Sequence, residues 1–294
     1  MAATRGRLPS GPDWVFEPKW DGCRLLASAS ATEGVHAWTR SGREVTGMLP
    51  ELDGLTDVVG DALLDGELVV LGEGLATDFH SCAARLRATS PAAIARGRRT
   101  HPAALVAFDL LRLEGEDLRG RPFFERRKLL EATGLNGPAW QVTAQTDDAA
   151  TMTAVARLHG LEGVVAKRLD APYRGGASHD WIKQRFAEVV DMVIGGVRLI
   201  RHGKIELLVG EETPTGLIYR GTVTARGRGT ENLPALLAVL ARPAHPFNTP
   251  VPAAHARGAT WLDPTVPVEV SYTALTPAGR MRQGRLNRIR TDVI

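Results

Sequence analysis

One lysine of this sequence lies in a stretch whose residue types could do nucleophilic chemistry. The chain has five lysines among 36 basic residues, so its positive charge normally comes from arginine. A lysine amine can lose its proton and attack an electrophile, which a guanidinium cannot do. Lys19 is followed by Asp21 and Gly22. This pattern is typical of a lysine on a short turn, with a carboxylate beside it and room for a ligand near the backbone.

The alternative interpretation of this stretch is an ordinary β-turn in which Lys19 and Asp21 are solvated surface charges. Short motifs often match by chance, so the choice depends on whether the rest of the chain supplies partners. Glu67 lies inside the apolar run of residues 62–70. A buried glutamate there would need a ligand or a metal as partner. A tight hairpin turn with Glu67 exposed is about as good an interpretation of that run.

Further charged residues lie at the ends or on one face of predicted strands. Glu162 and Lys167 stand at either end of an apolar run, and Phe108 lies in the apolar segment 104–111. Residues 180–185 alternate, so Lys183 and Arg185 share one face of a strand. A nucleophilic lysine serves Schiff-base chemistry or nucleotidyl transfer. The large number of positively charged residues favours a phosphoanhydride substrate. Lys and Arg would hold its oxygens, carboxylates would hold Mg²⁺, and an aromatic ring would stack on the base.

Size and composition predict two globular domains. The chain has 294 residues, of which 44% are hydrophobic and 23% charged. We place the boundary near Glu188, which gives domains of residues 1–188 and 189–294. The second part consists of short strand-like runs with one helix, at 233–240, and this fits a small β-barrel such as an OB-fold.

In the first part, apolar alternation predicts strands and helical spacing predicts helices. The predicted strands are 14–17, 24–27, 35–40, 62–70, 104–111, 160–168 and 180–185. The predicted helices are 49–58, 79–87, 121–132 and 147–159, with Asp147 or Thr146 as the cap of the last one. Arginines between 85 and 99 form a basic run, either a solvated face or a phosphate-contacting surface.

The charge distribution and the cysteine content limit the classes of partner and the cellular compartment that we expect. Residues 189–294 hold 13 basic and 8 acidic residues, which suggests a polyanionic partner. No apolar run is long enough to span a membrane, and no apolar segment follows the basic start as in a signal peptide. Cys23 and Cys82 are neither clustered nor at metal spacing, so we expect no zinc site, no disulfide and a reducing, cytoplasmic compartment.

The ordered motifs of the chain resemble those of the covalent nucleotidyltransferases, and specifically the ATP-dependent DNA ligases. The residues within these motifs most resemble those of the compact bacterial ligases of non-homologous end joining, in particular stand-alone versions of that ligase module. No P-loop or Rossmann glycine motif is present. The matching motifs are Lys19-Trp20-Asp21-Gly22 with Arg24, Asp65-Gly66-Glu67, Phe108-Asp109, Glu162-Gly163-Val164-Val165-Ala166-Lys167, Trp181-Ile182-Lys183-Gln184-Arg185 and Arg288-Ile289-Arg290-Thr291-Asp292.

This resemblance implies an α+β fold, with an ATP-grasp-like nucleotidyltransferase (adenylation) domain before an OB-fold barrel. It also implies ATP and Mg²⁺ or Mn²⁺ as cofactors. Lys19 would form a lysyl-AMP, with Asp21 orienting it or acting in later steps. Glu17 would contact the adenine amino group, and Phe108 would stack on the adenine.

The resemblance assigns the remaining residues to phosphate, ribose and metal. Arg24 and Arg40 would hold the ribose or the nick phosphate. Glu67 would bind the ribose or the metal, and Glu162 the catalytic metal. The α-phosphate region would be gripped by Lys167, Lys183 and Arg185, and pyrophosphate would be oriented by Arg290 and Asp292.

The implied reaction has three steps and one macromolecular substrate. The lysine attacks the α-phosphorus of ATP, AMP moves to the 5′-phosphate of a nick, and the 3′-OH expels AMP. The implied partner is nicked double-stranded DNA, with a Ku-like end-binding protein as a candidate recruiter and the ligase itself a monomer. Two departures concern the activation step, because Arg185 stands where many relatives have lysine and Val293 follows Asp292 where a lysine is usual.

Two other functions remain as alternatives. The nearer one is an RNA ligase or a GTP-using capping enzyme of the same superfamily; Trp20 and the Ile182-Lys183 pair favour DNA ligase. The other is a non-catalytic DNA-binding protein that uses the barrel. That function needs aromatic stacking platforms, and residues 189–294 offer four scattered aromatic residues.

We expect Lys19→Ala and Lys19→Arg each to abolish formation of an AMP adduct, because neither side chain supplies a neutral amine. Intact mass after incubation with ATP and a divalent metal measures the adduct directly. An AMP adduct that persists in Lys19→Arg would remove Lys19 from the nucleophile role.

Overall fold

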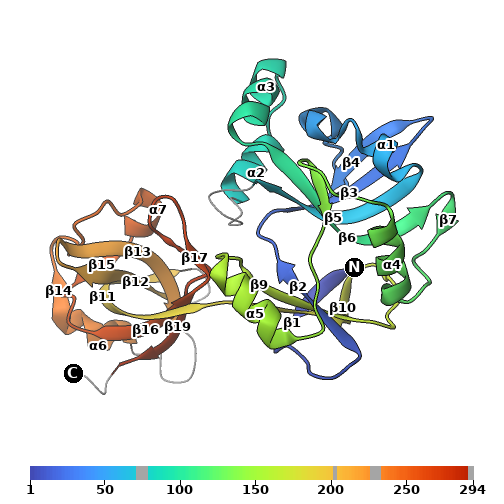
Figure 1. Cartoon of the computed structure of the whole chain (residues 1–294). Helices are drawn as coiled ribbons and strands as arrows, with labels where there is room; N and C mark the ends of the chain where they lie inside the picture. The colour runs from blue at the N-terminus through green and yellow to red at the C-terminus, as the bar shows by residue number, and fades with distance from the viewer. Residues whose placement is uncertain (71–78, 201–203, 226–232, 291–294) are drawn as a thin grey trace. The chain divides into compact units, whose positions relative to one another are not determined.

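The computed structural model describes all residues except 71–78, 201–203, 226–232 and 291–294. The chain forms two compact units, Met1–Arg185 and Phe186–Ile294, each with its own hydrophobic core. Both units mix strands and helices, with strands in the majority (Figure 1). The boundary of the functional domains near Glu188 stays a prediction, and Glu188 itself begins a strand.

The first unit contains a six-stranded sheet and a four-stranded sheet. The larger sheet has the order β4-β3-β5-β6-β7, with β8 parallel to β6, and the smaller has the order β1-β10-β9-β2. The strands of the larger sheet are β3 (Cys23–Ser30), β4 (Gly34–Thr39), β5 (Ala62–Val70), β6 (Ala103–Leu113), β7 (Glu116–Asp117) and β8 (Trp140–Val142). Those of the smaller are β1 (Ala2–Arg5), β2 (Trp14–Lys19), β9 (Gly163–Arg168) and β10 (Ala177–Arg185).

Helices α1, α2, α4 and α5 lie against the two sheets, whereas α3 projects from them (Figure 1). Helix α4 packs on β6, and α5 packs on β2 and β9. The helices are α1 (Leu55–Val59), α2 (Phe79–Arg85), α3 (Pro91–Thr100), α4 (Phe123–Ala132) and α5 (Ala149–Leu158), with 3₁₀ turns η1 (Thr46–Met48) and η2 (Pro50–Leu52). The larger core cluster lies under β3, β5 and β6 and includes Leu25, Leu64 and Leu105, none of which is exposed.

The seven strands predicted in this unit are all present, and several local features differ from the expectation. Residues 91–100 form α3 and residues 2–5 form β1, neither of which was predicted. Residues 49–58 divide between η2 and α1. Helix α5 is capped by Asp148, whose carboxylate accepts hydrogen bonds from the amides of Ala150 and Thr151. The predicted cap, Asp147 or Thr146, is therefore wrong.

The second unit is the barrel predicted from its short strands. Strand β11 pairs with β12, β15 and β16, and β16 also pairs with β19. Its core contains Ile194, Leu207 and Val268. The strands are β11 (Glu188–Ile200), β12 (Lys204–Thr213), β13 (Gly216–Ala225), β14 (Ala241–Arg242), β15 (Thr260–Leu262), β16 (Pro267–Tyr272), β17 (Ala274–Leu275), β18 (Met281–Arg282) and β19 (Arg285–Ile289). The helical turns are α6 (Leu233–Leu237), η4 (Ala238–Leu240) and α7 (Ala253–Ala256).

A fully buried ion pair joins α4 to the larger sheet. Arg126 on α4 donates from Nε to Asp109 on β6 at 2.7 Å, and neither side chain is exposed. A second guanidinium nitrogen donates to the same carboxylate at 2.8 Å. Because both charges are out of water, loss of one partner leaves the other buried and unpaired.

We expect Asp109→Ala to lower the free energy of unfolding by about 3–5 kcal/mol, since Arg126 would keep its charge in the interior. The matched control is Asp170→Ala, which removes a carboxylate from the exposed pair with Arg168 and should cost no more than about 1 kcal/mol. Urea denaturation monitored by tryptophan fluorescence compares the two. Equal losses would show that burial of the pair contributes nothing specific.

Candidate active site

The candidate nucleophile lies where the chain leaves the smaller sheet and enters the larger one. Lys19 ends β2 opposite Gly163, and the next strand, β3, already belongs to the larger sheet. The Lys19 Nζ donates to Glu162 Oε2 at 2.5 Å. Arg185 Nε lies 2.7 Å from the other oxygen of Glu162. One carboxylate thus contacts two of the predicted site cations, so the surface-turn interpretation of Lys19 does not hold.

Two glycines allow the backbones around Lys19 to approach closely. A Cβ at Gly22 would lie 2.1 Å from the Leu68 carbonyl oxygen and 3.0 Å from Glu67 Cγ. A Cβ at Gly163 would lie 2.1 Å from the carbonyl oxygen of Gln184. The space at Gly22 was expected to admit a ligand, but the protein's own strand β5 fills it.

Glu67 lies inside the continuous strand β5, so the hairpin interpretation of that run is wrong. Its carboxylate is partly buried and has no hydrogen bond or ion pair among the residues that the structure describes. Burial raises the pKa of Glu67 to about 7, although the positive charges of Lys19 and Arg24 oppose that rise. The nearby charge of Glu162 raises it as well. A carboxylate in this state gains from any cation brought beside it.

These two glutamates are the candidate metal donors. Carboxylate oxygens are the ligands that Mg²⁺ prefers, and such ions are commonly held by one or two carboxylates together with substrate phosphates. Within the described residues, no group of three or more His, Cys, Asp or Glu side chains could hold a metal by itself. The donor set formed by Glu67 and Glu162 therefore fits a metal that is also held by a phosphate-bearing substrate.

Lys183 and Arg40 add positive charge to the same place. Lys183 lies on β10, two residues before Arg185. Burial lowers the pKa of the Lys183 amine, and neighbouring cations lower it further. Those cations are Lys19, Arg185 and Arg40. Arg40 and Arg24 also line one hollow of about 430 Å³, together with Cys23 and Leu86. An anionic ligand would relieve the repulsion among these groups.

Arg24 is held by residues to which sequence reasoning assigned no role. Two of its guanidinium nitrogens donate to the buried carboxylate of Asp65, and one also donates to the Met1 carbonyl at 2.9 Å. The Tyr173 hydroxyl donates to Asp65 at 2.7 Å. Asp65 stands in the quoted motif, which could have marked it. Nothing in the sequence around Tyr173 signals this contact, because the tyrosine lies in the loop before β10.

Glu17 and Lys167 form a buried pair across β2 and β9. Their side chains are 3% and 2% exposed, and Lys167 Nζ lies 2.8 Å from Glu17 Oε2. Lys167 also donates to the carbonyl of Phe108 at 2.9 Å, and Arg127 contacts Glu17 from the other side at 3.4 Å. Burial raises the pKa of Glu17, and the two cations oppose that rise. Arg127 was missed by the sequence analysis because it lies on a helix with no motif.

The ring of Phe108 already has close neighbours. The Arg24 guanidinium lies 4.6 Å from its centroid, and Trp181 meets it edge-on at 5.9 Å. Among described residues, the indole N–H of the buried Trp181 has no hydrogen-bond partner. The stacking of Phe108 on adenine therefore stays a prediction, as does a phosphate contact by Lys167, whose amine is engaged with Glu17.

Asp21 and Arg290 complete the set of predicted site residues in the described part of the chain. Asp21 lies in the turn after β2 and is half-buried. Arg290 belongs to the second unit, where it pairs with Asp191 at 2.8 Å. Asp292 and Val293 lie outside the described residues. The roles of Asp21 and Arg290 therefore stay predictions.

Comparison with known proteins decides the family. A family model described as the ATP dependent DNA ligase domain matches residues 7–185, and one for the ATP dependent DNA ligase C terminal region matches residues 201–293. The chain belongs to the ATP-dependent DNA ligases. The predicted fold class, a nucleotidyltransferase domain followed by an OB-fold domain, is confirmed, and so is ATP as the cofactor. No helix of the described part of this ligase is long and apolar enough to span a membrane.

The ligase is similar to parts of larger proteins. It is 37% identical to the multifunctional non-homologous end joining DNA repair protein LigD of Mycobacterium tuberculosis, over 99% of this chain and 38% of that protein. The structure of mycobacterial DNA ligase D complexed with ATP and MES has 36% identity and a TM-score of 0.57, covering 99% of this chain and 94% of that one. A Lig E DNA ligase structure is 19% identical and has a TM-score of 0.60. The match covers 98% of this chain and 100% of that one, and it shows the shared fold.

The raised pKa of Glu67 predicts a pH-dependent cost of folding in the ligand-free ligase. A glutamate of ordinary pKa, 4.5, loses its proton in the unfolded chain well before Glu67 does in the folded protein, at about 7. Stability therefore falls as pH rises through this window and stays lower above it. Glu67→Gln cannot ionise, so it should exceed the wild type by about 2–3 kcal/mol at about pH 8 and by much less at about pH 4.

Urea denaturation with chelator at both pH values measures this difference. Glu212→Gln, at an exposed carboxylate of the second unit, is the control and should leave the pH dependence unchanged. A stability difference for Glu67→Gln that is the same at both pH values would contradict the assignment.

Proposed function

We propose that this chain seals nicks in double-stranded DNA through a lysyl-AMP formed on Lys19. The observation that carries the proposal is the contact of one carboxylate, Glu162, with both Lys19 and Arg185. The nucleophile is thereby oriented by a hydrogen bond before any nucleotide binds. The assignment of nicked DNA as the substrate rests on family membership. The preference for DNA over RNA at the nick is part of the proposal.

In the first step, Lys19 Nζ would form a bond to the α-phosphorus of ATP, and the bond to the pyrophosphate oxygen would break. The amine must be neutral to attack, and Glu162 lies at hydrogen-bond distance to accept its proton. Lys183, Arg185 and Arg24 would stabilise negative charge that develops on the phosphate oxygens. A divalent cation on Glu67 and Glu162 would neutralise phosphate charge and favour the neutral amine.

In the later steps, the AMP would move to a 5′-phosphate, and a 3′-hydroxyl would attack and release it. Arg40 is exposed at the edge of the site and is our candidate for the incoming nick phosphate. Glu17 and Phe108 would form the base end of the nucleotide pocket, and Lys167 would contact the α-phosphate region, with Asp21 orienting the nucleophile. Arg290 and Asp292 would act on pyrophosphate from the second unit.

The cellular role is proposed from the relatives. Two of the similar proteins are named as non-homologous end joining proteins, so we propose end joining as the pathway of this chain. A Ku-like end-binding protein would recruit it, and it would act as a monomer in the cytoplasm. These statements rest on similarity to proteins of which this chain spans about two-fifths.

Intact mass after ATP and Mg²⁺ tests the first step, and sealing of a labelled nicked duplex tests the whole reaction. We expect one added AMP, more sealing of nicked DNA than of nicked RNA, and loss of both activities in excess EDTA. Glu162→Ala should slow adduct formation on the order of 10²-fold, because it loses a carboxylate beside the reacting atoms. ATP binding should fall less than adduct formation.

The matched control is Glu188→Ala, at a carboxylate that begins β11 and accepts a hydrogen bond from the Tyr272 hydroxyl. A chain that takes up no AMP under any metal condition would contradict the proposed function. Adduct formation that is unchanged by EDTA would contradict the metal assignment alone.

A further inference from the structure

A series of exposed arginines leads from the edge of the active site to helix α3. The hollow that contains Arg24 and Arg40 also contains Leu86 at the end of α2. Arg43 donates to the carbonyl of Leu86 at 2.7 Å, and Arg87 follows directly. Helix α3 then adds three more arginines. We call the series the arginine track; its members are Arg40, Arg43, Arg87, Arg96, Arg98 and Arg99, all of them exposed.

Helix α3 is fixed in place although none of its side chains is buried. The buried Arg85 donates to Glu51 on η2, to the carbonyl of Met48 on η1 and to the carbonyl of His101 at the end of α3. A Cβ at Gly97 would lie 2.7 Å from Arg85 Cδ, so the glycine lets the arginine pass beneath the helix. The side chain of Ser90 caps the other end by accepting from the amide of Ala93. The arginines on α3 are therefore presented from a rigid support.

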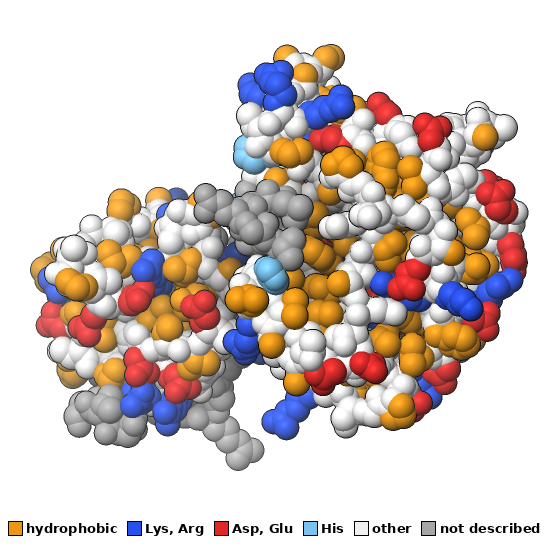
Figure 2. Space-filling view, in the orientation of Figure 1, with side chains coloured by type: hydrophobic (Ala, Val, Ile, Leu, Met, Phe, Trp, Pro, Cys, Tyr) orange, Lys and Arg blue, Asp and Glu red, His pale blue; other side chains and the backbone are white. Residues whose placement is uncertain are grey.

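The track carries positive charge that nothing in the described chain neutralises. None of its six arginines pairs with a carboxylate among the described residues, and α3 contains no acidic residue. The carboxylate beside the helix, Glu51, is already paired with Arg85. Figure 2 shows the Lys and Arg side chains gathered at the projection that carries α3. Such an uncompensated surface favours a polyanion.

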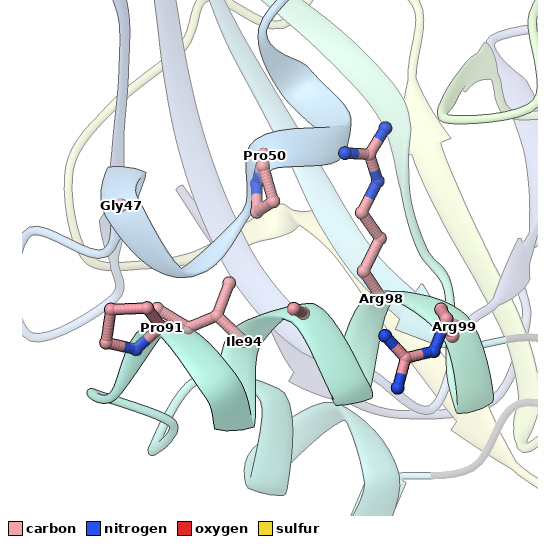
Figure 3. A pocket seen from close by; sticks show the side chains of 7 residues that line it. Gly47, Pro50, Pro91, Ile94, Arg98 and Arg99 are labelled. Atoms are coloured by element: carbon pink, nitrogen blue, oxygen red, sulfur yellow. The ribbon is translucent and has the colours of Figure 1, made fainter.

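A hollow of about 710 Å³ lies between α3 and the turns η1 and η2. Its floor is apolar, with Pro50 and Ile94, and Arg98 and Arg99 stand at one end (Figure 3). An acidic peptide could use such a hollow, but it would need only these two arginines. Four further arginines of the track, Arg40, Arg43, Arg87 and Arg96, lie outside the lining of this hollow, and the charge of Arg40 also acts on Lys183. This number of charges favours a long, regularly charged ligand.

We propose that the arginine track binds the phosphate backbone of a duplex arm outside the nick, with α3 holding the part of the arm farther from the active site. This inference rests on the proposed function, because the track begins at the site where the nick would lie. Phosphate contacts of this kind position a duplex without reading its sequence. They also make affinity depend steeply on salt, since each neutralised phosphate releases counterions.

The test measures binding of a nicked duplex that carries a 3′-dideoxy end and cannot be sealed. Arg98→Gln/Arg99→Gln is compared with the wild type over a salt series. We expect about tenfold weaker binding and a log–log salt slope flatter by about 1.8, which corresponds to two phosphate contacts. The loss should be independent of base sequence. It should disappear when the arm that reaches α3 is cut to a few base pairs, each arm being shortened in turn.

The matched control is Arg119→Gln/Arg168→Gln, which removes the same charge from the same unit. Both of these arginines are exposed and already paired, with Asp117 and Asp170. The control should keep the wild-type slope. Thermal unfolding and AMP uptake should be unchanged in both double variants, because neither touches the fold or the nucleotide site.

Three results would overturn the proposal: an unchanged salt slope, an equal loss in the control, or a loss that ignores arm length. An unchanged slope would favour an acidic peptide as the ligand of the hollow beside α3. Failure of the proposed function is distinguishable, since it appears as absent AMP uptake in the wild type. The binding comparison does not depend on that result.

Discussion

The arrangement of the first unit depends on a lysine that is buried between its two sheets. The side chain of Lys167 is 2% exposed, so its amine must find partners inside the protein. Glu17 supplies one from the adjacent strand β2, and the carbonyl of Phe108 supplies another from β6 of the larger sheet. The second contact ties the two sheets together. It holds them at the spacing in which Lys19, from one sheet, lies close to Glu67, from the other.

The charges around Lys19 explain why this region suits a nucleoside triphosphate. Glu162 is shared by two cations, while burial and neighbouring positive charges lower the pKa of Lys183. Burial raises the pKa of Glu67 to about 7. A metal ion would add positive charge beside Glu67, and a triphosphate would add negative charge beside Lys183. The ligand-free site is therefore electrostatically incomplete.

Charge also connects the site to the surface of the same unit. The arginines of the track are exposed and unpaired with carboxylates in the described structure, whereas buried arginines of the unit, such as Arg85 and Arg126, are paired with carboxylates. One residue type thus has two uses. Buried arginines bind loops and helices to the sheets, where each can satisfy several acceptors. Exposed arginines remain available to a polyanion whose phosphates lie at regular intervals.

The sequence by itself determined the family, the strands that carry the motifs and the candidate nucleophile, because short motifs in order and apolar periodicity are local properties of the chain. It did not determine α3, none of whose side chains is buried in the core. Nor did it reveal that Tyr173 supports Asp65, or that Gly22 makes room for β5. The tertiary structure decided these points, because they depend on which strands pair and on contacts between residues far apart in the chain.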